Sequence, residues 1–372
     1  MSATQKDSAR DGLEGVVVAE TRLSEVDGLK GRLIIAGHDV EELAGRIPFE
    51  AACWLLAHGK LPGSAQIDEV QRALGTARTN AFQNLPRIGD ALKMGNDMEA
   101  LRASTAHLSQ GDSGAVDQST ELIAATAVFA AARTRTRAGK SPLAPDPTLE
   151  HAADYLRMSL EHRPAKAAVD ALNTYLVTVV DHGMNASTFA ARVVASTNSD
   201  MVSAVVAAIG ALKGPLHGGA PGPVLDMLQA IDSPSKARSW LEAELSKGRR
   251  IMGMGHRVYR VRDPRAAVLE KAIEQLSKAG LATERLALAR AVEKEAERLL
   301  QERHPDRALR ANVEFYTAVL LDAIGLPGTA FTPTFAVGRV AGWCAHYLEQ
   351  QKAGRLIRPA SRYIGPRPSE KP

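Results

Sequence analysis

The sequence contains few aromatic residues and only two cysteines. Phe, Trp and Tyr make up 4% of the 372 residues, whereas 45% are hydrophobic, with Ala and Leu dominant. Strands favour aromatic and β-branched residues, while Ala and Leu lose little on entering a helix. Cys53 and Cys344 lie far apart in the chain, so we expect no disulfide framework and a reducing, cytoplasmic location. The composition thus predicts an all-α globular protein with a minor β-element.

Long apolar runs and dense basic runs are also missing. No uncharged apolar stretch reaches the length of a transmembrane helix. The polar residues 1–11 lack the apolar core of a secretory signal, and we expect them to be disordered. The net charge of +4 and the pI of about 9.0 are mild, and no Lys/Arg run has the density that nucleic-acid binding requires. We therefore expect neither a membrane nor a nucleic acid as a partner.

The histidines and cysteines do not show the spacing of a zinc site, and no phosphate-binding P-loop motif occurs. Metal catalysis is therefore not indicated.

The remaining pattern predicts helices almost throughout. Residues 15–19 and 32–36 are expected to form a short hairpin, with turn signals near Asp27-Gly28. Residues 120–138 are predicted to form a largely buried helix, and residues 185–212 a long apolar helix. Residues 219–320 are richer in Glu, Lys and Arg. We therefore predict a small helical domain at 219–320 and a large one at 12–218 and 321–372.

His217 lies in Gly214-Pro215-Leu216-His217-Gly218-Gly219, shortly before a helix expected to begin at Pro221. A helix dipole disfavours the cationic form of an imidazole at the helix N-terminus, so the ring stays neutral and can donate a hydrogen bond. A neutral donor suits stabilisation of an enolate oxygen. The same pattern also fits a loop histidine that only caps the helix.

His256 lies in Gly253-Met254-Gly255-His256-Arg257-Val258-Tyr259-Arg260, and two more arginines follow at 262 and 265. The glycines allow a ligand to approach the backbone, and the basic cluster suits an anionic small molecule. Arg265 follows Asp263-Pro264 in the first turn of a predicted helix, where it could hold a carboxylate with two hydrogen bonds. A solvated basic loop would also explain the other arginines.

Glu314 lies two residues after Asn312, a predicted helix cap. The helix dipole would lower the pKa of its carboxylate, so burial must offset this effect if Glu314 acts as a base. Ordinary acidic decoration of a first helical turn is the alternative.

Three further residues are candidates for anion binding. His182 follows Asp181 at the end of a predicted helix and could be a structural hydrogen-bonding residue. Arg339 lies within an apolar helix, where a charge must be paired, and a bound carboxylate would pair it. Arg358, in the basic C-terminal segment, could bind a carboxylate or simply lie on the surface.

Together, these segments resemble the citrate synthase family from about Gly12 to Pro366. The matching segments include 182–187, 212–219, 253–265, 312–316 and Arg358-Pro359. The resemblance implies an almost all-helical homodimer with a large and a small domain, and condensation of acetyl-CoA with oxaloacetate and water to citrate and coenzyme A.

The resemblance also implies roles for individual residues. Catalysis is assigned to His217, His256 and Glu314, with Glu314 standing where Asp is usual. Substrate carboxylates are expected to bind His182, Arg265, Arg339 and, from the partner subunit, Arg358. No tightly bound cofactor is expected. Coenzyme A, as part of the substrate, is expected to contact Met252, Gly253, Gly255, Arg257, Arg260 and Arg262.

Two alternatives stay open at this point. One is a 2-methylcitrate synthase that uses propionyl-CoA, because one methylene in an acyl pocket changes discrimination by only roughly 1–3 kcal/mol. The other is a weakly active paralogue that binds coenzyme A esters. The short N-terminal segment leads us to expect no regulatory domain of the kind that responds to NADH.

Overall fold

The computed structural model describes residues 12–13, 15–109, 114–219, 221–256, 258–281, 283–307, 309–366 and 368. The predicted disorder of residues 1–11 lies outside these ranges. The all-α prediction is confirmed, because helices dominate the described chain and one small sheet accompanies them. None of the described helices combines the length and apolar character needed to cross a bilayer.

The structure describes helices along most of the chain. In chain order they are α1 (Val40–Leu43), α2 (Phe49–His58), α3 (Ser64–Gln83), α4 (Asp97–Ala106), α5 (Ala115–Arg137), α6 (His151–Leu160), α7 (Lys166–Val179), α8 (Ala186–Ala195), α9 (Met201–Leu212), α10 (Pro221–Ile231), α11 (Ala237–Ser246), α12 (Pro264–Lys278), α13 (Thr283–Arg303), α14 (Val313–Ala323) and α15 (Phe331–Ala353). Short 3-10 turns are η1 (Leu85–Ile88), η2 (Ala91–Lys93), η3 (Pro234–Lys236) and η4 (Gly328–Ala330).

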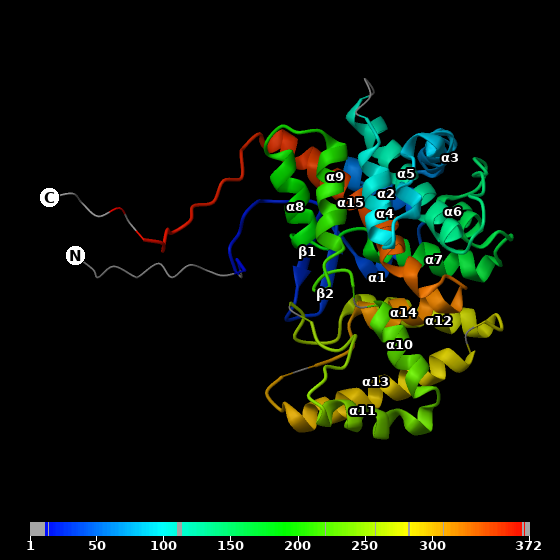
Figure 1. Cartoon of the computed structure of the whole chain (residues 1–372), viewed down its shortest axis with the longest axis vertical. Coiled ribbons are helices and arrows are strands. Elements are labelled where there is room, and N and C mark those ends of the chain that lie inside the picture. The colour runs from blue at the N-terminus through cyan, green and yellow to red at the C-terminus, as the bar shows by residue number, and fades with distance from the viewer. Residues whose placement is uncertain are drawn as a thin grey trace.

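Helices α10 to α14 lie together at one end of the molecule, and α15 returns from them to the other helices (Figure 1). There α15 packs against α2, α5, α7, α8 and α9. Its side chains from Phe331 to Tyr347 are almost all buried, so it forms the centre of this larger group. The exact division at 12–218, 219–320 and 321–372 stays a prediction.

The sheet differs from the predicted hairpin in its first strand. Within the described residues the sheet contains β1 (Ser24–Asp27), β2 (Arg32–Ile35) and β3 (His38–Asp39), all antiparallel. The prediction of a strand at residues 15–19 is wrong, because this segment pairs with nothing in the described sheet and Val17 is 85% exposed. A turn of four residues joins β1 to β2, which is within the range of hairpin loops, whereas residues 15–19 would have needed a much longer connection.

The prediction of a single apolar helix at residues 185–212 is also wrong. This segment forms two helices, α8 and α9, which pack against each other. The connecting residues 196–200 are polar, and Asn198 adopts the left-handed conformation with φ 62°. The side chain of Asp200 then caps α9 by accepting a hydrogen bond from the Ser203 amide at 2.7 Å.

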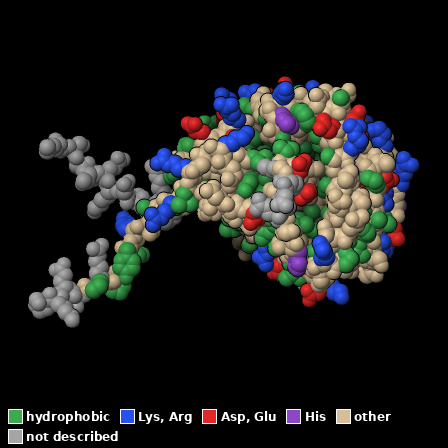
Figure 2. Space-filling view, turned by 90° about the horizontal axis from the view of Figure 1, so that it is seen from above, with side chains coloured by type: hydrophobic (Ala, Val, Ile, Leu, Met, Phe, Trp, Pro, Cys, Tyr) green, Lys and Arg blue, Asp and Glu red, His purple; other side chains and the backbone are tan. Residues whose placement is uncertain are grey.

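Helix α5 begins at Ala115, five residues before the predicted start, and residues 122–132 on it are buried as expected. The 3-10 turn η3 leads directly into α11. On the face that Figure 2 shows, basic and acidic side chains are intermixed over the body.

Candidate active site

Two glycines of α15 allow the end of α7 to lie directly on its backbone. A Cβ at Gly338 would lie 2.6 Å from a side-chain carbon of Val179, and one at Gly342 would lie 2.3 Å from the carbonyl oxygen of Val180. Backbones approach this closely only where side chains are absent. The crossing therefore brings Arg339, which lies between the two glycines, to the residues that follow α7.

Arg339 is a buried cation. Its side chain is 1% exposed, its Nε donates to the carbonyl oxygen of Val179, and its guanidinium carbon lies 4.7 Å from the ring centre of Phe335. Burial lowers the pKa of Arg339 to about 10, so it remains charged at neutral pH. Its Nη2 has no hydrogen-bond partner among the described residues. Because an unpaired buried donor is costly, this nitrogen is well suited to bind the carboxylate of an anion.

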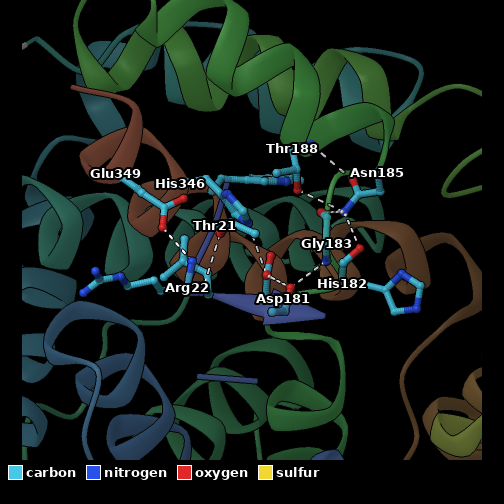
Figure 3. A network of polar contacts seen from close by, with 12 residues as sticks. Thr21, Arg22, Asp181, His182, Gly183, Asn185, Thr188, His346 and Glu349 are labelled. Carbon is cyan, nitrogen blue, oxygen red and sulfur yellow. Dashed lines mark hydrogen bonds and ion pairs between the residues drawn. The ribbon is translucent and has the colours of Figure 1, made fainter. Parts of the chain in front are cut away.

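His182 follows α7 and is held by a buried polar network. Asp181 accepts hydrogen bonds from Ser24 of β1 and, at 3.2 Å, from Nε2 of His346 on α15. The hydroxyl oxygen of Ser24 also accepts from the Gly183 amide at 2.7 Å. Figure 3 shows this network, with the His182 ring pointing away from it. Hydrogen bonds therefore hold the residues on both sides of His182 in place. The ring itself lies near Arg265 and Arg339.

The loop that carries His256 is attached to the start of α14. Gly253 and Gly255 have φ angles of 75° and 83°, a conformation that glycine adopts without strain. The Gly255 amide donates to the carbonyl oxygen of Arg310 at 2.7 Å. Asn312 donates from its side chain to the Gly255 carbonyl oxygen at 2.8 Å and caps α14 by accepting from the Glu314 amide at 3.0 Å. These contacts hold His256 and Glu314 on neighbouring segments.

The hydrogen bonds of His256 determine where its proton lies. Its Nδ1 accepts from the amides of Val258 at 3.0 Å and Tyr259 at 3.1 Å. Nδ1 is therefore unprotonated, and in the neutral ring Nε2 carries the proton. Nη2 of Arg265 lies 3.5 Å from Nε2, and both atoms are donors. They are thus arranged to share an oxygen atom of a ligand.

His182 joins this group through Tyr259. Its Nε2 lies 3.1 Å from the Tyr259 hydroxyl, and its ring is 5.8 Å from that of His256 in an edge arrangement. Burial and the positive charges of Arg265 and Arg339 hold the pKa of His182 well below its ordinary value. His182 is consequently neutral and can donate a hydrogen bond.

Arg265 is buried in the first turn of α12 and paired with Asp263. Its Nε and Nη2 donate to the two carboxylate oxygens of Asp263 at 3.0 and 2.8 Å. Asp263 also caps α12 and accepts from the Val313 amide at 3.2 Å. This pair fixes the Arg265 guanidinium with its remaining edge toward His256.

His217 lies near the same arginines. Its Nε2 is 2.8 Å from the Ser187 hydroxyl oxygen. That oxygen accepts a hydrogen bond from the Trp343 indole at 3.1 Å. Burial, together with Arg339 and Arg265, lowers the pKa of His217 to about 4. The ring is neutral near pH 7, with Nδ1 as the nitrogen available to a ligand.

Glu314 lies in the first turn of α14, and its carboxylate favours the charged forms of both Arg265 and Arg339. The structure therefore brings together six of the seven predicted catalytic and carboxylate-binding residues, namely His182, His217, His256, Arg265, Glu314 and Arg339. Arg358 is exposed on the C-terminal segment after α15, away from this cluster.

The residues predicted to contact coenzyme A do not all lie in this cluster. Met252, Gly253 and Gly255 lie on the loop before His256, and Arg260 is exposed beyond it. Arg262 is ion-paired with Glu270 at 2.9 Å and Glu293 at 3.0 Å, so its charge is already compensated. Arg257 lies outside the described residues.

The sequence reasoning assigned no role to Tyr259, Asp263, Ser187 or Ser24. Tyr259 and Asp263 lie within the motif around His256, and the cap signal of Asp263 was visible before Pro264. Ser24 is 157 residues from Asp181, and nothing local in the sequence indicates that contact. Among the described residues, no three His, Cys, Asp or Glu side chains form a group that could hold a metal ion.

The two low histidine pKa values lead to a prediction on stability. Burial, with Arg265 nearby, lowers the pKa of His256 to about 4, as it does for His217. Between about pH 4 and the ordinary value of 6.5, the unfolded chain binds more protons at these residues than the folded chain. The free energy of unfolding should therefore rise with pH across this window.

Urea unfolding across the window measures this slope. The double variant His217→Gln/His256→Gln should show a shallower rise than the wild type, because two of the linked groups are removed. An unchanged slope in that variant would contradict the low pKa values.

Comparisons with known proteins agree with this arrangement. A family model described as "Citrate synthase, C-terminal domain" matches residues 12–360. Citrate synthase of Haloferax volcanii is 38% identical, with 95% of each chain covered. A 2-methylcitrate synthase of Mycobacterium tuberculosis is 34% identical over 97% of this chain and 92% of the relative. The structure of a citrate synthase from Thermoplasma acidophilum, in a ternary complex with carboxymethyl coenzyme A and oxaloacetate, has a TM-score of 0.83 and 31% identity over 97% of each chain.

Proposed function

The chain belongs to the citrate synthase family, and we propose that His217, His256 and Glu314 carry out the family's reaction in this protein. The enzyme condenses acetyl-CoA with oxaloacetate and water to give citrate and coenzyme A. One observation supports these roles best. The neutral histidines lie close to Arg339, a buried arginine whose Nη2 lacks a hydrogen-bond partner among the described residues, and to the carboxylate of Glu314.

The first step forms the nucleophile. Glu314 removes a proton from the methyl group of the thioester, and His217 donates a hydrogen bond to the thioester oxygen on which charge develops. The low pKa of His217 keeps it neutral. In this proposal the Ser187 hydroxyl donates its proton to Nε2 of His217, so Nδ1 carries the ring proton and serves as the donor.

The second step forms the carbon–carbon bond. The enol carbon attacks the keto carbon of oxaloacetate, whose oxygen accepts a hydrogen bond from Nε2 of His256. The fixed tautomer of His256 supplies that donor without rearrangement, which is electrostatic preorganisation. Water then cleaves the citryl thioester, which releases citrate and the thiol.

His182, Arg265 and Arg339 bind the carboxylates of oxaloacetate in this proposal. Two fixed guanidinium groups set the orientation of a dicarboxylate and neutralise it, which is mainly a positioning effect. The unsatisfied Nη2 of Arg339 would gain its missing acceptor from the substrate.

Coenzyme A is bound as part of the substrate, and no tightly held cofactor takes part. Met252, Gly253 and Gly255 offer backbone to the thioester arm, while Arg260 and Arg257 supply charge for the phosphates. Arg262, already paired with two glutamates, contributes less than the sequence alone indicated.

We further propose that the enzyme is a cytoplasmic homodimer. The segment after α15 extends from the body on the same side as the described residues that precede β1 (Figure 1), and it exposes Leu356, Tyr363 and Ile364. Exposed apolar side chains on an extended arm favour contact with a second subunit. Arg358 on this arm would then complete the carboxylate site of the partner.

The dimer proposal predicts complementation between two inactive variants. A mixed dimer of an Arg358→Leu subunit and a Glu314→Gln subunit should be active, because one of its two sites regains both residues. Co-expression with two affinity tags isolates the mixed dimer, and turnover per dimer should reach about half of the wild-type value, since one site of two is intact. No activity in a verified mixed dimer, or an active monomer in solution scattering, would exclude the role across the interface.

Thiol release by the purified protein with oxaloacetate and either acetyl-CoA or propionyl-CoA tests the proposed function. Similarity to a 2-methylcitrate synthase makes propionyl-CoA the relevant competitor. We expect the larger kcat/KM with acetyl-CoA. Release with neither thioester would favour a weakly active coenzyme A ester-binding paralogue.

A further inference from the structure

The turn between β1 and β2 lies directly against the basic segment that follows His256. The Arg260 amide donates to the carbonyl oxygen of Gly28 at 2.8 Å. A Cβ at Gly28 would lie 2.3 Å from the carbonyl oxygen of Val258, and one at Gly31 would lie 2.6 Å from a side-chain carbon of Val261. The contact at Gly28 is backbone against backbone, so no side-chain rotation can make room for a larger residue.

The other end of β1 is attached to the carboxylate-binding part of the site. Ser24, the first residue of β1, contacts both Asp181 and the Gly183 amide, on either side of His182. A four-residue strand spans roughly 13 Å. Strand β1 and the turn after it thus contact both the segment that carries His182 and the segment that carries Arg260.

Arg260 differs from its basic neighbours in its charge pairing. Arg262 is paired with Glu270 and Glu293, and Arg265 is paired with Asp263. The guanidinium of Arg260 forms no ion pair within the part of the chain that the structure describes, and the residue is exposed. Its charge is therefore available to an anion such as a phosphate group.

We propose that Gly28 is a positioning residue for the coenzyme A thioester. Because it has no side chain, the backbone of Val258 to Arg260 can lie directly against the β1–β2 turn, and this contact places Arg260. This inference depends on the proposed function. It adds a residue of the turn between β1 and β2 to those that determine thioester binding. An alanine at position 28 would push the Val258–Arg260 backbone away by on the order of 1 Å, a displacement that is large for binding and catalysis.

The test uses four full-length variants, namely Gly28→Ala, Arg260→Ala, the double variant, and Gly95→Ala as a control. A Cβ at Gly95 meets nothing within 4 Å. We expect Gly28→Ala to raise the KM of the thioester roughly tenfold, equivalent to about one charge-assisted hydrogen bond. The affinity for oxaloacetate, measured by calorimetry, should stay within about twofold. Gly95→Ala should match the wild type in both.

The double variant separates a positioning role from a general structural one. If Gly28 acts through Arg260, Gly28→Ala should add little to the effect of Arg260→Ala, because residues that act together are not additive. Full additivity, or an unchanged thioester KM in a folded Gly28→Ala protein, would overturn the proposal. An equal loss of oxaloacetate affinity would overturn it as well, because the effect would not be confined to the thioester.

Gly31→Ala is the milder variant if Gly28→Ala does not fold. Its Cβ would contact the end of the Val261 side chain, which can move, although its φ of 64° adds some strain. A smaller rise in thioester KM supports the proposal, and no rise overturns it. A wild-type protein that releases no thiol would overturn the proposed function itself, which distinguishes that failure from a failure of this inference.

Discussion

Replacing Glu314 by glutamine is expected to remove most turnover while the protein still folds and binds oxaloacetate. Glutamine keeps the size of the side chain but cannot accept the methyl proton. General-base catalysis contributes roughly 10²- to 10⁴-fold, so kcat should fall within that range. Calorimetry should give an oxaloacetate affinity close to that of the wild type, since Glu314 is not one of the carboxylate-binding residues.

Glu284→Gln is the matched control, because Glu284 is an exposed glutamate in the first turn of α13. It should turn over like the wild type. Near-native turnover in Glu314→Gln would show that another group is the base.

Arg339→Leu and Arg265→Leu should both weaken oxaloacetate binding strongly, but only Arg265→Leu should lower the stability of the unliganded protein. Each variant removes a cation opposite a carboxylate, which costs roughly 2–5 kcal/mol of binding. Arg339 is a buried charge with an unsatisfied donor, so an apolar replacement should leave the unliganded protein as stable as before or more so. Arg265→Leu instead leaves Asp263 buried without its counter-charge, which should lower the free energy of unfolding by roughly 3–5 kcal/mol.

Thermal unfolding with and without oxaloacetate measures both effects. The wild type should gain stability from the ligand, and both variants should lose most of that gain. Arg78→Leu is a control for Arg265→Leu, because Arg78 forms a fully buried ion pair with Asp154 outside the cluster. It should lose stability but retain the gain from oxaloacetate. Unchanged oxaloacetate affinity in both Arg339→Leu and Arg265→Leu would mean that these arginines have only structural roles.

The sequence was most informative where a local signal coincided with a chemical one. Asn312 and Asp263 were recognisable as helix caps, and the residues that follow them, Glu314 and Arg265, are placed by those caps. Arg339 stood out because a charge in an apolar helix needs a partner. The glycines before His256 were interpreted as allowing a ligand to approach the backbone, and in the structure both adopt positive φ angles.

The predictions from sequence were wrong where a local pattern fitted more than one structure. They were incomplete where contacts between distant segments determine the structure. Residues 15–19 have strand-like composition, but the short turn after Asp27 selects Ser24–Asp27 as the pairing strand. The run 185–212 is apolar enough to mask the polar turn at 196–200, which breaks it into two helices. The approach of α7 to Gly338 and Gly342 depends on tertiary packing, which periodicity along one segment does not reveal.

The central position of α15 has a consequence for synthesis on the ribosome. This helix supplies Arg339 and the His346 contact to Asp181, and its Glu349 accepts a hydrogen bond from the Arg22 amide, 327 residues earlier. Chains grow at about 5–20 residues per second from the N-terminus, so the helices that surround α15 emerge long before it does. Until α15 is released, they lack their central packing partner and expose apolar surface. A nascent chain of this protein should therefore bind chaperones until α15 emerges, and premature termination before α15 should give an aggregating product instead of a weakly active enzyme.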